Sequence, residues 1–461
     1  MVFSNLSFLF LNDRLKNKIV APMNTRQAIN LPVLLLLICP VILPATAYGQ
    51  SKKTGSSPDA YVKAMQTLTS DKAVIEAFKI IDNLEPYTLK EHIELTEIPA
   101  PPFKESVRAQ HFKKMLEAAG PDKVWIDSLG NVLALRKGKT GKRTVVLDAH
   151  LDTVFPEGTD VKVKAKGDTL FAPGISDDTR GLIVMLTVLK VLEKASIETA
   201  DDILFVGSLG EEGLGDLRGV KFVVNKSKLK IDSWISVDGT DIAEINNGAL
   251  GSVRYKATVK GPGGHSWGAF GLGNPHHAMA KGLNYFSDEA MRFTSTGIKT
   301  SFNVGRTGGG TSVNSIPFES WMEVDMRSES PQQLKKIDSI FKATLARGVE
   351  DYNKSIKKGP ALTLTLEQIG FRPSGTTQEK EPIVQRALAA AKYFNPTPKL
   401  AIGSTNSNIA IAKGIPAITL GAGGKSNNEH SLGEWWLNDK GAEGIKCVLL
   451  TLLLETGLEK K

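Results

Sequence analysis

The stretch TVVLDAHLDTVFPEG, residues 144–158, ends a run of β-branched and apolar residues with a histidine and an aspartate two positions apart. Side chains alternate along a strand, so His150 and Asp152 are expected on the same face of the strand's end. A histidine that binds a metal usually donates its second ring N–H to a carboxylate, and this spacing allows that pairing. The alternative for a single His-x-Asp is an ordinary surface hydrogen bond.

More carboxylates follow the ends of other predicted strands. Glu211 and Glu212 end the apolar stretch ILFVGSLGEE, and Asp238 follows the apolar strand in WISVDGTD. Adjacent carboxylates point in different directions, so one can bind a metal while the other faces the substrate as a general base. An acidic surface loop and a turn aspartate are the alternatives.

Two further positions complete a candidate ligand set. Asp177 and Asp178 precede a helix predicted over 179–194, where a helix cap is the alternative. His430 lies in a glycine-rich loop after the strand predicted at 415–420, and a loop histidine without a role is the alternative. If the strand ends converge, two imidazoles and three carboxylates can hold two divalent ions, with one carboxylate bridging. Such a pair activates water for attack on a carbonyl or phosphoryl centre.

The elements that must position these residues alternate in type along the chain. Helical periodicity over 60–120 is followed by a single strand, KVWIDSLGNVLALRKG, and then by strands interleaved with amphipathic helices. This pattern predicts an α/β fold with a mostly parallel central sheet, which binds ligands at the carboxyl ends of its strands. From residue 246 the pattern changes to half-exposed strands and two helices, which indicates an inserted α+β module.

Composition limits the function further. The chain has 461 residues, 41% hydrophobic and 23% charged, and carries a formal net charge of +8. It contains no dense Lys/Arg block with interleaved aromatic residues, so nucleic-acid binding has no support. These values are typical of a soluble globular protein.

The N-terminus reads as an export signal. Arg26 precedes LPVLLLLICPVILPATAYG, an apolar core followed by small residues, with cleavage expected after Ala47 or Gly49. A membrane anchor is the alternative, disfavoured because the apolar run is short and holds two prolines. Translation starts at Met1 or Met23. After cleavage one cysteine remains and no intrachain disulfide is possible. We therefore expect a bacterial periplasmic or secreted protein without a stable membrane partner.

From about residue 85 to 455 the chain resembles the M20 family of co-catalytic metallopeptidases, the group that contains glutamate carboxypeptidase, peptidase T and bacterial dipeptidases. The resemblance rests on the order and spacing of these motifs: HLDTV, GISDDTRG, GEEGLGD, SVDGT, GGHSWG, NSIP with VDMRS, and GGKSNNEHSLGE. It implies a zinc-exopeptidase-like catalytic domain with an inserted dimerisation (lid) domain. The implied division is a signal peptide at 1–49, catalytic parts at 50–245 and 362–461, and the inserted domain at 246–361.

The resemblance also implies a role for each candidate residue. Asp177 would bridge two divalent metal ions, which are most often zinc in this family. His150 and Asp238 would complete one metal site, and Glu212 and His430 would complete the other. Glu211 would be the general base and Asp152 would orient His150. His265 would stabilise the tetrahedral oxyanion, commonly from the partner subunit of a homodimer. Asn314 and Arg327 would contact the substrate; a turn residue and a strand-end salt bridge are the alternatives for these two. Asn406 departs from the aspartate commoner in relatives.

These features predict an exported metal-dependent exopeptidase that hydrolyses an amide bond in short peptides. An aminoacylase or deacylase of N-acyl amino acids on the same fold is the alternative. A more remote alternative is a non-catalytic binding protein with the same fold. It is disfavoured because every expected metal ligand and the general base are present in the sequence.

Overall fold

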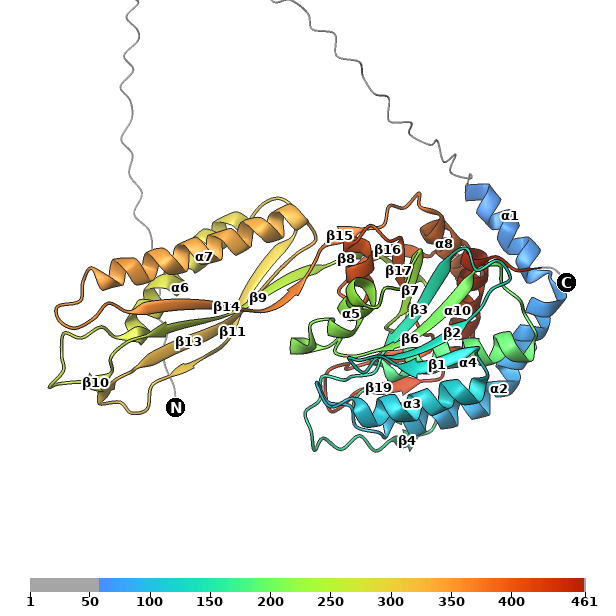
Figure 1. Ribbon diagram of the computed structural model, residues 1–461, viewed down its shortest axis with the longest axis horizontal. Helices are drawn as coiled ribbons and strands as arrows, with labels where there is room; N and C mark the ends of the chain where they lie inside the picture. The colour runs from blue at the N-terminus through green and yellow to red at the C-terminus, as the bar shows by residue number, and fades with distance from the viewer. Residues whose placement is uncertain (1–57, 460–461) are drawn as a thin grey trace, which may run out of the picture. The chain divides into compact units, whose positions relative to one another are not determined.

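The computed structural model describes residues 58–459 (Figure 1). The predicted signal peptide therefore lies outside the described residues. Among the helices of residues 58–459, none is both long enough and apolar enough to cross a membrane.

A nine-stranded sheet forms the larger part of the fold. Its centre consists of parallel neighbours, in the order β6 (Asp202–Ser208), β3 (Thr144–His150), β7 (Ser233–Val237) and β17 (Ala417–Leu420). These strands are almost wholly buried, as their unbroken apolar runs predict for a parallel sheet covered on both faces. The outer strands are β1 (Lys123–Ile126), β2 (Val132–Arg136), β8 (Glu244–Ala249), β15 (Gly375–Thr376) and β16 (Lys399–Gly403). The predicted α/β fold with its central parallel sheet is confirmed.

Helices cover both faces of this sheet, and the alternation of side chains along β3 shows how. Val145 and Leu147 belong to one apolar core, whereas Val146 between them belongs to another. The first core is shared with α1 (Pro58–Thr69), α2 (Lys72–Thr96), α3 (Ser106–Ala119), α4 (Thr179–Lys194), α8 (Pro382–Phe394) and α10 (Gly441–Thr456). The second is shared with α5 (Arg218–Lys226) and α9 (Ser407–Ala412).

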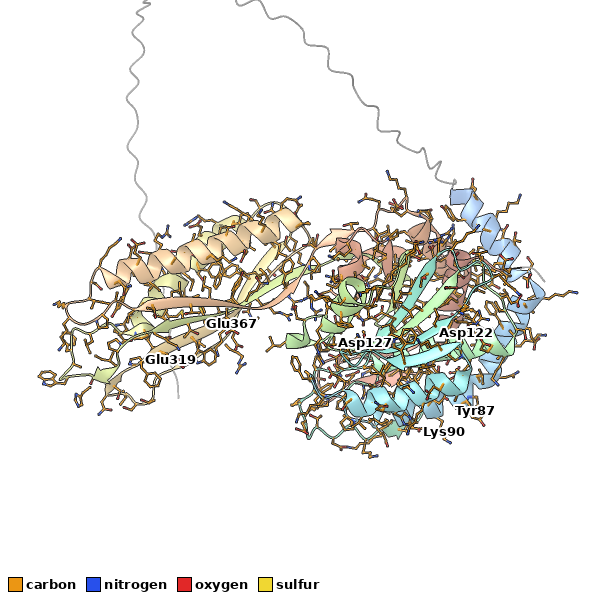
Figure 2. The ribbon with its side chains drawn as sticks, viewed as in Figure 1. Tyr87, Lys90, Asp122, Asp127, Glu319 and Glu367 are labelled. Atoms are coloured by element: carbon orange, nitrogen blue, oxygen red, sulfur yellow. The ribbon has the colours of Figure 1, made fainter. Side chains whose placement is uncertain are left out.

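One predicted strand is two. The stretch KVWIDSLGNVLALRKG folds as an antiparallel hairpin of β1 and β2. Its turn is held by the Asp127 carboxylate (labelled in Figure 2), which accepts hydrogen bonds from the backbone N–H groups of Leu129, Gly130 and Asn131 at 2.9–3.0 Å. Gly130 has φ +116°, a conformation that favours glycine. The single-strand prediction was wrong because Asp-Ser-Leu-Gly-Asn is a turn sequence.

The inserted module has its own antiparallel sheet, in the order β11 (Thr300–Gly309), β13 (Glu319–Ser328), β9 (Gly251–Lys260) and β14 (Thr363–Arg372). Figure 1 shows α6 (Pro275–Thr294) and α7 (Pro331–Asn353) on one face of this sheet. Burial alternates along β13, as expected for a sheet with one covered face. A separate two-stranded antiparallel sheet pairs β10 (Gly264–His265) with β12 (Ser315–Ile316) in the module.

A small antiparallel sheet joins two distant loops. Its order is β18 (Lys425–Asn427), β19 (Trp435–Leu437), β5 (Thr169–Phe171) and β4 (Lys164–Lys166). The pairing of β19 with β5 places Trp435 opposite Phe171. The loop that carries His430 is thereby fixed next to the loop that leads to Asp177, through a strand pairing that the sequence analysis did not predict.

Candidate metal centre

Histidine and acidic side chains lie at the carboxyl ends of the central strands. His150 is the last residue of β3, and Asp238 directly follows β7. Glu211 and Glu212 follow the end of β6. These strands are parallel neighbours and end at one edge of the sheet, so their four side chains are brought together.

Asp177 lies between two imidazoles. Its Oδ1 is 3.0 Å from Nε2 of His150, and its Oδ2 is 2.9 Å from Nε2 of His430. The same nitrogen of His430 is 3.0 Å from Oε1 of Glu212. Ligand atoms of His150, Asp177 and Glu212 all lie within 4.8 Å of one another, the spacing of a group able to hold a metal ion. The carboxylate thus offers one oxygen to each histidine.

The charges of this cluster favour a bound cation. Burial raises the pKa of Asp238 well above its usual value, and the charge of Asp177 raises it further. Burial and Asp177 also raise the pKa of Glu212, to about 7. Hydrogen bonds to Asp177 and Glu212 raise the pKa of His430 to about 11. Buried carboxylates at this density need nearby positive charge, and nitrogen and oxygen donors of this kind suit divalent transition metals. The residues therefore fit a metal centre.

The loop before α4 is held by a residue that the sequence analysis did not single out. The buried Glu434 carboxylate accepts hydrogen bonds from the backbone N–H groups of Gly174, Ser176 and Asp177 at 2.8–3.1 Å. It also accepts the hydroxyl of Ser176 at 2.7 Å. Glu434 follows His430 in sequence, so one segment supplies a histidine and also positions Asp177.

Asp178 does not act as a helix cap. It occupies the N-cap position of α4 without a capping hydrogen bond, and its Oδ2 accepts the backbone N–H of His150 at 2.9 Å. The peptide bond between Asp177 and Asp178 is cis. Asp178 therefore links the start of α4 to the end of β3.

Asp152 contacts both halves of the candidate site. Its carboxylate accepts the backbone N–H groups of Glu211 and Glu212, each at 2.9 Å. Nδ1 of His150 is 3.0 Å from the Asp152 carbonyl oxygen and 3.6 Å from its Oδ1. The hydrogen-bond acceptor for Nδ1 of His150 is thus the backbone of Asp152, while the Asp152 side chain fixes the two glutamates.

The two glutamates point to different partners. Glu212 faces His430, whereas Oε1 of Glu211 is 2.7 Å from Nη1 of Arg372, the last residue of β14. Arg372 also donates to Oγ of Ser404 at 3.1 Å and to the Glu211 carbonyl. The sequence analysis missed Arg372, because no local pattern links it to a residue 161 positions earlier.

The three other predicted site residues lie in the inserted module. Nδ1 of His265 is 3.2 Å from the backbone nitrogen of Trp267. The Asn314 carbonyl accepts the backbone N–H of Ser266, so Asn314 lies beside His265. Nε of Arg327 donates to Asp325 at 2.7 Å, the salt bridge named above as its alternative. Within residues 58–459, every side-chain hydrogen bond of these three residues is made inside the module.

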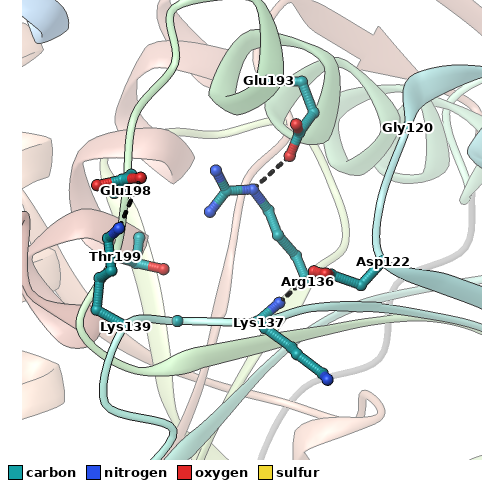
Figure 3. A pocket seen from close by; sticks show the side chains of 9 residues that line it. Gly120, Asp122, Arg136, Lys137, Lys139, Glu193, Glu198 and Thr199 are labelled. Atoms are coloured by element: carbon teal, nitrogen blue, oxygen red, sulfur yellow. Dashed lines mark hydrogen bonds and ion pairs between the residues drawn. The ribbon is translucent and has the colours of Figure 1, made fainter.

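A separate polar cleft of about 280 Å³ lies elsewhere, near Arg136 (Figure 3). Arg136 ends β2 opposite Ile203, near the start of β6, whereas the glutamates follow the end of β6. Two of its positive groups are paired: Arg136 with Glu193 at 2.5 Å and Lys139 with Glu198 at 3.0 Å. This cleft does not resemble the metal centre.

Fold and site together define a metal-binding hydrolase with an α/β catalytic sheet. The chain belongs to peptidase family M20/M25/M40, whose family model matches residues 146–454. It is therefore a hydrolase of the M20 type, acting on peptide or amide C–N bonds. The predicted resemblance is confirmed.

Individual relatives are distant. The uncharacterized protein YqjE of Bacillus subtilis (strain 168) is 25% identical over 356 residues, which are 74% of this chain and 91% of YqjE. A tripeptidase from Staphylococcus aureus has a TM-score of 0.63 at 23% identity, over 80% of this chain and 97% of its own. The B. subtilis YXEP protein, a dinuclear metal-binding M20 peptidase, has a TM-score of 0.59 at 15% identity, over 81% and 99%. These two likenesses show the fold.

Proposed function

We propose that the chain is an exported metal-dependent exopeptidase that hydrolyses an amide bond in short peptides. The observation that carries this proposal is the Asp177 carboxylate, which offers one oxygen toward His150 and the other toward His430. A carboxylate in that position suits a bridge between two divalent ions. Export is supported by the apolar leader with its small-residue end, and a periplasmic or secreted location follows from it.

The proposed ligands divide into two sets around Asp177. His150 and Asp238 would complete one metal site, and Glu212 and His430 would complete the other. Two zinc ions held there would supply an activated water at neutral pH and polarise the scissile carbonyl. The dinuclear centre named for the YXEP protein supports this count of ions.

Glu211 is the proposed general base. Its carboxylate is buried next to the cluster and bonds Arg372 instead of His430, so it is free of the proposed ligand set. It would take a proton from the attacking water and return it to the leaving amine, while the backbone N–H of Glu211 stays fixed by Asp152. Asp152 would thus position the base and, through its carbonyl, the His150 ring.

A homodimer would complete the site. His265 is exposed and bonds only within the module, so we propose that it reaches the oxyanion of a partner subunit's substrate. Asn314 lies beside it and would contact the substrate carbonyl. Arg327 would bind a substrate carboxylate, for which its paired N–H donors are suited, after exchange with Asp325.

Product analysis by mass spectrometry tests the reaction. Zinc-loaded protein, residues 51–461, is incubated with dipeptides, tripeptides and N-acyl amino acids, with Glu211→Gln as the blank. Cleavage of peptides is expected, and the released end separates aminopeptidase, carboxypeptidase and dipeptidase activity. If only N-acyl amino acids are cleaved, the proposed function changes from an exopeptidase to an aminoacylase or deacylase. No cleavage with two metals bound would favour the binding protein.

A mixing experiment tests the shared site. His265→Ala is expected to lower kcat with unchanged metal content, and Glu211→Gln to lower it about 100-fold or more as a lost general base. In a verified heterodimer of the two variants, one of the two active sites combines Glu211 of one subunit with His265 of the other, so activity should recover in part. No recovery would exclude a histidine that acts across the dimer.

A further inference from the structure

A buried polar network lies between β3, β6, β7 and the start of α9, and the proposed reaction does not use it. Asp148 is fully buried and Asn406 is 3% exposed. Nδ2 of Asn406 is 2.5 Å from Oδ2 of Asp148 and 2.8 Å from Oγ of Ser208. Both amide hydrogens of Asn406 are therefore donated.

The network requires one acid and one amide. Oδ1 of Asp148 accepts Nε1–H of Trp234 and the hydroxyl of Ser236, each at 2.5 Å, and Asn406 gives the third hydrogen bond. A carboxylate at position 406 would face Asp148 with no hydrogen between them when both groups are ionised. An amide at position 148 would place its nitrogen opposite Nδ2 of Asn406, donor against donor, where Asn406 now meets an acceptor.

Exchange of the two groups preserves the bonding. With Asp148→Asn and Asn406→Asp together, the amide oxygen at 148 accepts from Trp234 and Ser236, and its nitrogen donates to the carboxylate at 406. The Ser208 hydroxyl, which now accepts from Asn406, turns to donate to that carboxylate. The side chains differ by one atom type, so the exchanged pair fits the same space.

The pair connects the elements that carry the candidate catalytic residues. Asp148 precedes His150 by two positions on β3, and Ser208 ends β6 just before the Glu211 loop. The Ser208 carbonyl also accepts the backbone N–H of Leu151 at 2.7 Å. Asn406 thus ties β3 to β6 at the edge where the metal centre lies.

The pair also supports Glu211 from its other side. Asn406 stands at the start of α9, two positions after Ser404. The carbonyl and the hydroxyl of Ser404 accept hydrogen bonds from Arg372 at 3.3 and 3.1 Å, and Arg372 holds the Glu211 carboxylate. Because Arg372 bonds both Ser404 and Glu211, a displacement of the start of α9 would also displace the Glu211 carboxylate.

We infer that Asp148 and Asn406 form an acid–amide pair that positions His150 and Glu211 for hydrolysis, an inference that rests on the proposed function. Both act through other residues, so they are positioning residues. The pair needs one carboxylate and one amide. The hydrogen bonds form whichever of the two positions holds the carboxylate.

The test compares Asp148→Asn, Asn406→Asp and the double exchange with the parent protein. At saturating zinc each single variant is expected to lose about 10-fold or more in kcat, with KM within about 3-fold, and the double exchange to recover to within about 3-fold of the parent. Asn225→Asp, an exposed position that adds the same charge, is the matched control. Asn406→Ala removes a donor without adding charge and should lose less than Asn406→Asp.

Two readouts separate positioning from folding and from the choice of substrate. Melting temperatures of the metal-free proteins should fall in both single variants and recover in the double exchange. Zinc affinity, measured by chelator competition, should follow the same pattern even if no tested substrate is cleaved. A double exchange no better than the worse single variant would overturn the pair, also where single variants fail to fold. If the single variants keep the parental kcat and zinc affinity and only their melting temperatures fall, the pair stabilises the fold without positioning the site, and the inference is overturned.

Discussion

Nη1 of Arg372 lies 2.7 Å from Oε1 of Glu211, and both side chains are about 95% buried. Arg372 is the last residue of the module's strand β14, whereas Glu211 follows β6 of the central sheet. The proposed base therefore depends on a strand that the chain forms much later. Its carboxylate is held by one charged partner in an environment with little water to replace it.

Arg372→Gln is expected to destabilise the metal-free protein by about 3–5 kcal/mol, because it leaves the Glu211 carboxylate buried without a counter-charge. Adding Glu211→Gln should restore part of that loss, since the unpaired charge is then gone. Urea unfolding of the parent, both single variants and the double variant measures the coupling. Strictly additive losses would show that the ion pair carries no coupling energy.

Glu434→Gln is expected to weaken zinc binding about 10- to 100-fold, as for other groups that orient a metal ligand. Oε1 of the carboxylate accepts two backbone N–H groups and one hydroxyl, and Oε2 accepts the N–H of Gly174, so the nitrogen of an amide in either place meets a donor. Competition with a chelator measures the affinity. The exposed Glu379→Gln serves as the control. Equal zinc affinity in the parent and Glu434→Gln would contradict the proposed support of Asp177.

Metal content should distinguish a bridging carboxylate from a terminal one. Asp177→Asn is expected to lose both ions, because its two oxygens face two different imidazoles. Asp238→Asn is expected to retain one ion, held by Glu212 and His430. Elemental analysis after dialysis gives the zinc content per chain. Two ions retained in Asp177→Asn would exclude the bridge.

The buried His92, which is not one of the proposed ligands, predicts a pH dependence of stability. Its Nε2 donates to the Ile175 carbonyl, and burial, with the charge of Arg180, lowers its pKa from the ordinary 6.5 to about 3. The folded protein thus excludes a proton that the unfolded chain binds. The contribution of neutral His92 is therefore complete above the unfolded pKa and is lost as the pH falls from 6.5 toward 3.

Urea unfolding of metal-free parent and His92→Gln measures this difference from about pH 7 to about pH 4. Below about pH 6 the parent should lose about 1.4 kcal/mol per pH unit more than the variant. His277→Gln, at an exposed histidine, is measured in the same way as the matched control. Parallel curves for the parent and His92→Gln would show that His92 accepts a proton in the folded state.

The sequence predicted the central sheet because its strands carry unbroken apolar runs, and it predicted which residues gather at their ends because parallel strands end together. His150, Asp177, Glu212 and His430 lie within hydrogen-bond distance of one another as a connected group. Those positions could be predicted from the sequence because each lies next to an apolar strand or a helix that the sequence itself indicates.

The supporting residues could not be read in the same way. Arg372 and Glu434 follow no local rule, and their importance comes from contacts with residues far away in the chain. The β1–β2 turn was misread although its Asp-Ser-Leu-Gly-Asn sequence signals it. Asn406 was visible only as a departure from a family pattern, and its partner Asp148 became apparent from the distance between them.

The place of β17 has a consequence for the order in which the protein is assembled. β17 lies between β7 and β8, so the central sheet has a gap until residues 417–420 are present. β19, which fixes the His430 loop, comes later still. A growing chain therefore cannot bring His430 to Asp177 until nearly all of it has emerged, so the proposed site of Glu212 and His430 would be completed among the last events of its biogenesis.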